Sequence, residues 1–135
     1  ANIADILAKE ADFFSIGTND LTGYTMASDR GNDKVAYLYS WYYPAVLRAI
    51  KNIIVNGVEK GIMVGMCGEA AADPLLTPLL LSWGMEEFSV SAPSVLKTRK
   101  AISMWSKADA DALEAKVMQL DTADEVKAAL MEAAR

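Results

Sequence analysis

The chain has 135 residues, of which 53% are hydrophobic and 23% are charged, and its 13 Lys and Arg against 18 Asp and Glu give a net charge of −5. It contains one cysteine and no histidine. This composition excludes an internal disulfide, a Ser/His or Cys/His catalytic pair and a phosphohistidine within the chain. A pI near 4.7 without a basic run argues against nucleic acid or an anionic membrane as the main partner.

The sequence also shows no segment that is typical of a membrane span or a signal peptide. The longest apolar run, residues 75–83, contains Pro78 and is too short to span a bilayer. No signal peptide opens the chain, so we expect a cytoplasmic protein with no membrane partner. The first residue is Ala1 rather than Met, which either initiator removal or origin as a fragment would explain.

Three short runs are typical of β-strands, at residues 12–16, 62–66 and 87–91. Each is followed by a polar or glycine-containing loop and then a helical pattern, which predicts βα units around a parallel sheet. We expect helices from Pro44 to near Gly61, from the Asp73-Pro74 pair to Gly84, and from Pro93 onward. Residues 107–135 predict two surface helices, each opened by a capping box (Ser106 with Asp109, Thr122 with Glu125).

Three parallel strands do not make a closed barrel. A (β/α)₈ barrel needs eight strands and about 250 residues. The chain is therefore expected to be either a small open α/β sheet or the last part of a larger α/β fold.

Ligands of parallel α/β folds bind at the carboxyl ends of the strands. The first predicted strand is followed by Gly17, Asn19 and Asp20, and then by Arg30. Gly17 lets backbone approach a ligand, Asp20 offers a hard carboxylate for Mg²⁺, and Arg30 offers a planar fork for phosphate or carboxylate. The alternative is a turn whose Asn and Asp side chains cap backbone, with Arg30 on the surface.

The second strand end carries Cys67 between glycines, followed by Glu69. A thiol on a tight turn at the ligand edge could donate or take a proton near neutral pH. The alternative is a buried Cys that acts as a small hydrophobe. The third strand end, residues 91–94, offers only hydroxyls, and the aromatic cluster 41–43 is expected to serve packing or an interface.

Two segments resemble a known family. Residues 12–33 (DFFSIGTNDLT through DRGND) are similar to a signature of phosphoenolpyruvate-utilising enzymes, and residues 65–69 (GMCGE) resemble their catalytic-cysteine turn. Residues 87–94 and 120–126 resemble the phosphoenolpyruvate–protein phosphotransferases, enzyme I of the bacterial sugar phosphotransferase system. They fit that family better than pyruvate phosphate dikinase or phosphoenolpyruvate synthase, which stay as alternatives.

The resemblance implies that residues 1–135 are the C-terminal part of a (β/α)₈ (TIM) barrel, comprising its last three βα units and C-terminal helices. It implies that Asn19, Asp20 and Arg30 bind phosphoenolpyruvate, that Asp20 is also a Mg²⁺ ligand, and that Cys67 protonates enolpyruvate. It further implies a homodimer and, through a separate domain, a histidine-containing phosphocarrier partner. Mg²⁺ and Arg30 would stabilise the enolate that protonation then traps.

The sequence departs from the family at several points. The second Mg²⁺ carboxylate, further arginines and the phosphorylated histidine are missing from it, so we expect these 135 residues alone to be inactive. Tyr43 stands where a His is common, and Ala72 stands where a Gly is usual, which could shift the turn beside Cys67. A non-catalytic association module and a stand-alone small binding domain are the other hypotheses.

Overall fold

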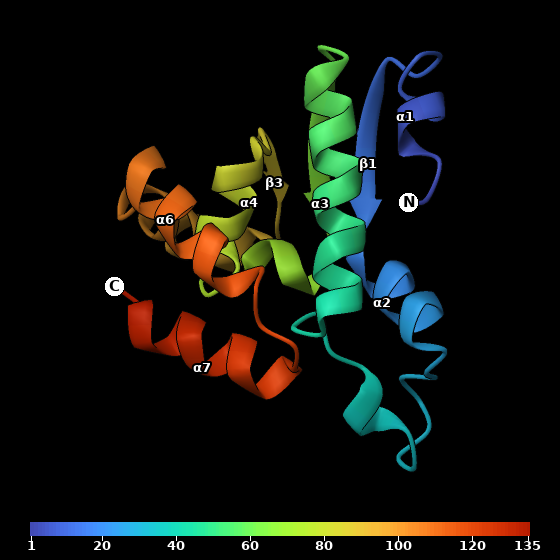
Figure 1. Ribbon diagram of the computed structural model, residues 1–135, viewed down its shortest axis with the longest axis vertical. Coiled ribbons are helices and arrows are strands. Elements are labelled where there is room, and N and C mark those ends of the chain that lie inside the picture. Colours follow the sequence, from blue (N-terminus) through green and yellow to red (C-terminus); the bar gives the residue numbers. More distant parts are fainter.

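The protein contains one parallel sheet of three strands, as a computed structural model of residues 1–135 shows (Figure 1). The strands are β1 (Phe13–Gly17), β2 (Met63–Cys67) and β3 (Glu87–Ser89), in the order β1-β2-β3. Their register pairs Gly17 with Cys67, and Cys67 with Ser89. The strands therefore end at one common edge, and the predicted α/β class with parallel strands is confirmed.

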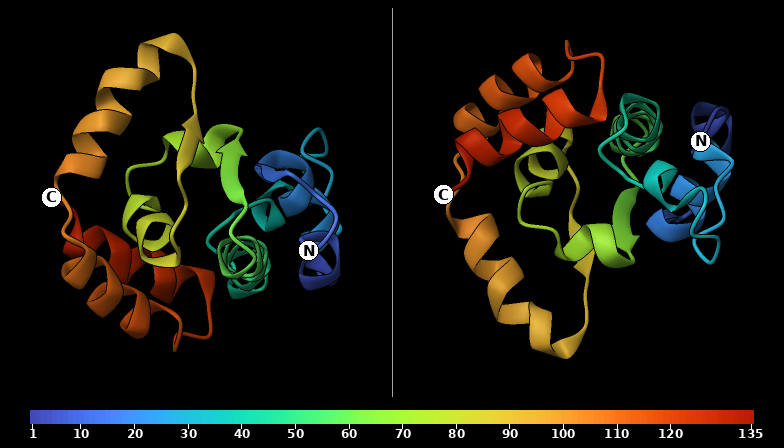
Figure 2. Two further views of the ribbon diagram at one scale, coloured as in Figure 1. Left: turned by 90° about the horizontal axis from the view of Figure 1, so that it is seen from above. Right: turned by 90° about the horizontal axis from the view of Figure 1, so that it is seen from below.

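Helices cover one face of this sheet. The α-helices are α1 (Ala4–Leu7), α2 (Thr18–Met26), α3 (Pro44–Glu59), α4 (Thr77–Trp83), α5 (Val95–Ser103), α6 (Lys107–Val117) and α7 (Ala123–Ala133), and the short 3₁₀ turns are η1 (Ala36–Leu38), η2 (Glu69–Ala72) and η3 (Ala92–Ser94). Helix α3 packs on β1 and β2, α4 packs beside α3, and α6 and α7 form an outer layer beyond α4 (Figures 1 and 2). None of the helices has the length and apolar composition needed to cross a membrane.

Helix α3 packs tightly on the sheet through its apolar stripe. Pro44 occupies its first turn, and Val46, Leu47, Ile50 and Ile54 are buried almost completely. The contact is closest at Gly57, where an added Cβ would lie 2.4 Å from Cγ2 of Val64 on β2 and 3.2 Å from Cδ2 of Phe14 on β1. A glycine here lets the helix backbone approach both strands.

The opposite face of the sheet has no helix on it. Phe13 is 57% exposed and Met63 is 42% exposed, although both are large apolar residues in strands. Parallel sheets are normally covered on both faces. The chain itself therefore leaves this face open, with Phe13 and Met63 as its exposed apolar residues.

Two predicted boundaries were wrong. The stretch after β1 was expected to be a loop, but α2 begins directly at Thr18 because Thr18 and Thr22 are buried on one side of a helical turn. The helix expected to begin at Asp73-Pro74 begins instead at Thr77. Asp73 accepts a hydrogen bond from the Leu75 amide at 2.9 Å, so it closes a turn before the helix rather than capping it.

The tail helices begin with side-chain caps, as predicted. Thr122 and Glu125 form a reciprocal capping box at the start of α7. At the start of α6 only half of the box is present: Ser106 accepts from the Asp109 amide, while the Asp109 carboxylate lies 2.9 Å from Arg135. The tail is joined to the body partly through Glu114, which accepts from Trp83 and Lys51 at 2.9 and 2.7 Å.

Replacing Gly57 by Ala should destabilise the protein. Overpacking against Val64 costs roughly 1–3 kcal/mol, and the better helix propensity of Ala returns only about 1 kcal/mol, so the free energy of unfolding should fall by up to about 2 kcal/mol. Urea unfolding followed by circular dichroism measures this. Gly31→Ala, whose Cβ would meet nothing closer than 3.4 Å, is the control and should change stability by less than about 0.5 kcal/mol. Equal effects at both glycines would contradict the close packing of α3.

The α7 capping box should make stability depend on pH in the acid range. Hydrogen bonds from the Thr122 hydroxyl, and from the amides of Asp121 and Thr122, lower the pKa of Glu125 below its ordinary value. A lowered folded-state pKa means that the stabilisation is complete above the ordinary pKa and is lost as pH falls through the folded-state value. Between about pH 6 and pH 3, Glu125→Gln should therefore show a shallower loss of unfolding free energy than the unmodified protein. Identical pH slopes would exclude this role.

Candidate functional site

The first part of the site lies where β1 passes into α2. The strand ends at Gly17, and Thr18, Asn19 and Asp20 form the first turn of the helix. Amide groups in a first turn have no partner within the helix, and the helix dipole favours negative charge there. This end of α2 is therefore an electropositive backbone edge with Asn19 and Asp20 projecting from it.

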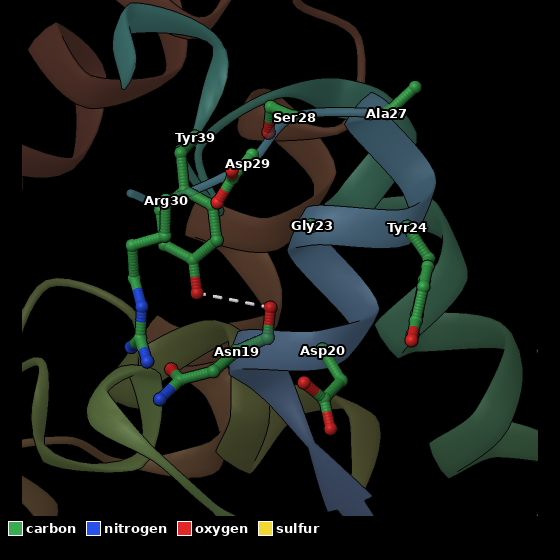
Figure 3. Close-up of a pocket in the computed structure, with 9 residues that line it drawn as sticks. All are labelled: Asn19, Asp20, Gly23, Tyr24, Ala27, Ser28, Asp29, Arg30 and Tyr39. Carbon is green, nitrogen blue, oxygen red and sulfur yellow. Dashed lines mark hydrogen bonds between the residues drawn. The ribbon is translucent and has the colours of Figure 1, made fainter. Parts of the chain in front are cut away.

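Arg30 is brought to the same place by the segment that follows α2. Asn19, Asp20 and Arg30 line an open hollow of about 530 Å³, together with residues 23–24, 27–29 and Tyr39. Figure 3 shows the Arg30 guanidinium and the Asn19 amide pointing toward one another on one side of the hollow, while the Asp20 carboxylate extends in another direction. The three predicted ligand-binding residues thus share one hollow.

Two polar groups that line this hollow make weak contacts or none within the chain. Oδ1 of Asn19 is buried and has no hydrogen-bond partner, which is costly unless a ligand or water supplies one. Arg30 has only a 3.8 Å pair with Glu69, and both side chains are more than half exposed. Such an exposed pair contributes little, so the guanidinium can exchange it for an anion.

Tyr39 contacts both Asn19 and Arg30, and Figure 3 shows it beside Arg30. Its hydroxyl donates to the Asn19 carbonyl at 3.0 Å, and the Arg30 guanidinium carbon lies 5.8 Å from the centre of its ring. This distance falls within the range of a cation–π contact. The sequence analysis did not single out Tyr39, because nothing in its local pattern indicates that the chain returns to the start of α2.

Cys67 lies at the neighbouring strand end and is exposed. The alternative of a buried thiol is therefore wrong: the side chain belongs to the uncovered face of the sheet, at the end of β2. Its Sγ donates a weak hydrogen bond to the Ile16 carbonyl at 3.6 Å. Cys67 does not line the hollow of Arg30, but Asn19 also lines a second hollow with Gly68 and Glu69, the two residues after the cysteine.

The aromatic cluster 41–43 holds Asp73, in the segment that follows the Cys67 turn. Trp41 donates to the Asp73 carboxylate at 2.8 Å, and the Tyr42 hydroxyl donates to the same carboxylate. Burial, with the hydrogen bond and the negative charge of Asp73 adding to it, raises the pKa of Tyr42 far above its ordinary value. The packing interpretation of this cluster agrees with these contacts. Ala72, just before Asp73, has no positive φ, so its Cβ causes no backbone strain there.

The chain does not bring a complete set of metal ligands together at this edge. No three of its Cys, Asp and Glu side chains come together in a way that could hold a metal ion. Two carboxylates line the hollow, Asp20 and Asp29, and Asp29 already accepts from the Gly31 amide at 2.8 Å. Mg²⁺ is commonly bound by only one or two carboxylates together with substrate phosphates and waters, so Asp20 fits as one ligand of such a site.

The comparisons with known proteins agree on one family. Residues 1–106 match the family of PEP-utilising enzymes, PEP-binding domain. The chain is 51% identical to the phosphoenolpyruvate-protein phosphotransferase of Bacillus subtilis (strain 168) over 132 residues, which is 98% of this chain and 23% of the relative. It is 52% identical to the proteins of the same name from Bacillus sp. (strain S) and Geobacillus stearothermophilus over 126 residues, 93% of this chain and 22% of each relative. The chain thus spans less than a quarter of the length of these relatives.

The exposure of Cys67 predicts that its thiol reacts in the folded protein. Under native conditions, Ellman's reagent should modify one thiol per chain before any unfolding, because exposed thiols react as thiolates without prior opening of the structure. Absorbance of the released thiolate, with circular dichroism as a check of folding, measures this. A thiol that reacts only after denaturant is added would restore the buried interpretation.

Proposed function

This chain belongs to the family of PEP-utilising enzymes, PEP-binding domain, and on that premise we propose that it is part of a transferase that moves the phosphoryl group of phosphoenolpyruvate to a protein histidine. The observation that carries this proposal is the edge where β1 and β2 end. There Asn19 and Arg30 line one hollow, and an exposed cysteine thiol lies at the end of the neighbouring strand, β2. An anion site beside a proton donor is what the reaction of an enol phosphate requires.

In the proposed reaction the residues have separate roles. Arg30 and Asn19 bind the phosphate and carboxylate of phosphoenolpyruvate, since a guanidinium forks onto either group and an amide donates without adding charge. The P–O bond breaks as the phosphoryl group passes to a histidine elsewhere in the parent protein, and its electron pair stays on the enol oxygen. The Cys67 thiol then gives its proton to the methylene carbon, which yields pyruvate, and the thiolate regains a proton from water.

Mg²⁺ is the proposed cofactor, with Asp20 as the ligand from this chain. Bound there, the ion would supply positive charge beside the oxygen that loses the phosphoryl group. The chain itself contributes the orienting groups: the first turn of α2 fixes Asn19 and Asp20 relative to each other, and Tyr39 steadies Arg30. The remaining metal ligands are proposed to come from the rest of the parent protein.

The uncovered sheet face supports a larger domain. Phe13 and Met63 are exposed on it, and covering such apolar surface contributes about 25 cal/mol per Å². We propose that residues 1–135 form the C-terminal part of a (β/α)₈ barrel whose other strands cover this face, and that the 135 residues alone do not turn over phosphoenolpyruvate. Without a histidine, they also cannot carry the phosphoryl group.

The partners proposed for the parent protein follow the same reaction. They are phosphoenolpyruvate and pyruvate, a histidine-containing phosphocarrier protein reached through a separate domain, and a second copy in a homodimer. An exposed free thiol fits the reducing cytoplasm, which we propose as the location. Light scattering on the full-length protein at micromolar concentration tests the dimer, and a clean monomer would exclude it.

The division of roles can be tested with point variants of the full-length protein. Cys67→Ser should lower kcat for pyruvate formation by about 100-fold or more, because general acid catalysis contributes 10²–10⁴-fold, while the affinity for phosphoenolpyruvate stays nearly unchanged. Arg30→Ala should instead raise KM about tenfold or more, since a charge-assisted hydrogen bond contributes about 1.5–3 kcal/mol. Steady-state kinetics coupled to pyruvate measures both.

Arg48→Ala is the matched control for the arginine variant. Arg48 is an exposed arginine of α3 outside the hollow, and its removal should leave both kinetic constants within about twofold. Normal turnover by Cys67→Ser would overturn the role of the thiol. An equal loss in Arg30→Ala and Arg48→Ala would overturn the role of Arg30.

A further inference from the structure

One buried hydroxyl joins the two halves of the proposed site. Thr18 is completely buried at the first position of α2, and its Oγ1 donates to the Cys67 carbonyl at 3.1 Å. The two residues are 49 positions apart in the chain. Because Asn19 follows Thr18 directly, this bond connects the anion-binding turn with the thiol turn.

Cys67 makes hydrogen bonds to the residues on both sides of Gly17, the last residue of β1. The cysteine carbonyl accepts from Thr18, which follows Gly17, and the cysteine thiol donates to the carbonyl of Ile16, which precedes it. Gly17 is also the register partner of Cys67 in the sheet. The place of the thiol is therefore set by the strand and helix that carry Asn19, rather than by its own loop alone.

Gly68 leaves the room that this hydrogen bond needs. Its φ of +100° lies in the region that favours glycine, and an added Cβ would lie 2.6 Å from Thr18 Oγ1 and 3.3 Å from Asn19 Oδ1. Any side chain at position 68 would press against both atoms. The glycine after the cysteine thus protects the contact between the two turns.

We propose that Thr18 is a positioning residue that sets the Cys67 thiol at the correct distance from the ligand held by Asn19. The inference rests on the proposed function, and it adds a residue that touches neither substrate nor metal. Proton transfer to carbon needs close alignment of donor and acceptor, and a misplacement of 1 Å can cost about 100-fold in rate. Loss of the hydroxyl should therefore lower the rate of the chemical step more than the affinity for phosphoenolpyruvate.

The test compares three threonine variants in the full-length protein. Thr18→Val keeps the side-chain shape but removes the donor, and it should lower kcat about tenfold or more with KM within about twofold. Thr18→Ser keeps the donor and should restore kcat to within about twofold. Thr22→Val is the matched control: Thr22 is an equally buried threonine of the same helix whose hydroxyl has no partner, and its replacement should leave both constants unchanged.

A second measurement follows the thiol independently of turnover. The rate at which iodoacetamide modifies Cys67, measured by peptide mass spectrometry over a range of pH, should change in Thr18→Val and stay the same in Thr18→Ser and Thr22→Val. If Thr18→Val does not fold by circular dichroism, Thr18→Ala against Thr18→Ser isolates the hydroxyl in the same way. A Ser variant no better than the Ala variant would then overturn the proposal.

The outcomes separate this inference from the proposed function. If Thr18→Val leaves kcat and the alkylation profile of Cys67 unchanged, the positioning role of Thr18 is overturned, while the role of Cys67 as proton donor stands. Equal losses in Thr18→Val and Thr22→Val would also overturn it, because general packing of α2 would then be the cause. An unmodified full-length protein that forms no pyruvate would refute the proposed function, whereas the alkylation profiles would still decide whether Thr18 controls the thiol.

Discussion

The parallel pairing of β1 with β2 is the constraint on which the site depends. It places Gly17 opposite Cys67, so the two strands end side by side and the turns that follow them meet. Backbone hydrogen bonding alone would bring the turns together, but it would not fix their side chains. The buried Thr18 hydroxyl adds a link between the two turns, because it donates from the first residue of α2 to the Cys67 carbonyl. The groups proposed to bind the anion and the thiol therefore share one edge built on strands and a helix, which positions side chains more precisely than loops do.

The packing behind the sheet keeps this edge in place. Helix α3 lies so close to the strands that Gly57 leaves no room for a methyl group against Val64. Trp41 and Tyr42 reach the Asp73 carboxylate and fix the segment after the cysteine turn to the start of α3. The other face has no such support: Phe13 and Met63 are exposed there. The chain thus stabilises one side of its sheet and leaves the other side, where Cys67 lies, uncovered.

Much of the fold could be predicted from the sequence, because its signals are local. Alternating and apolar runs predicted all three strands, and Pro44, Ser106 and Thr122 predicted helix starts through their local chemistry. Helix α2 escaped prediction because the residues that define it, such as Asn19 and Asp20, are equally common in turns, and burial of Thr18 and Thr22 decides for the helix only after the sheet has formed. The side chains predicted to bind a ligand do gather at one edge, whereas Tyr39 and the hydroxyl bond of Thr18 depend on contacts between distant segments, which no local pattern indicates.

We propose that Arg30 and Cys67 act on a single bound molecule at the ends of β1 and β2. The most direct test of this proposal is the rate of alkylation of Cys67 in the full-length protein as phosphoenolpyruvate is added in the presence of Mg²⁺. Phosphoenolpyruvate should protect the thiol, and Arg30→Ala should raise the concentration needed for half-protection about tenfold or more, because the lost charge-assisted contact contributes about 1.5–3 kcal/mol. Alkylation that stays equally fast at saturating phosphoenolpyruvate would contradict it.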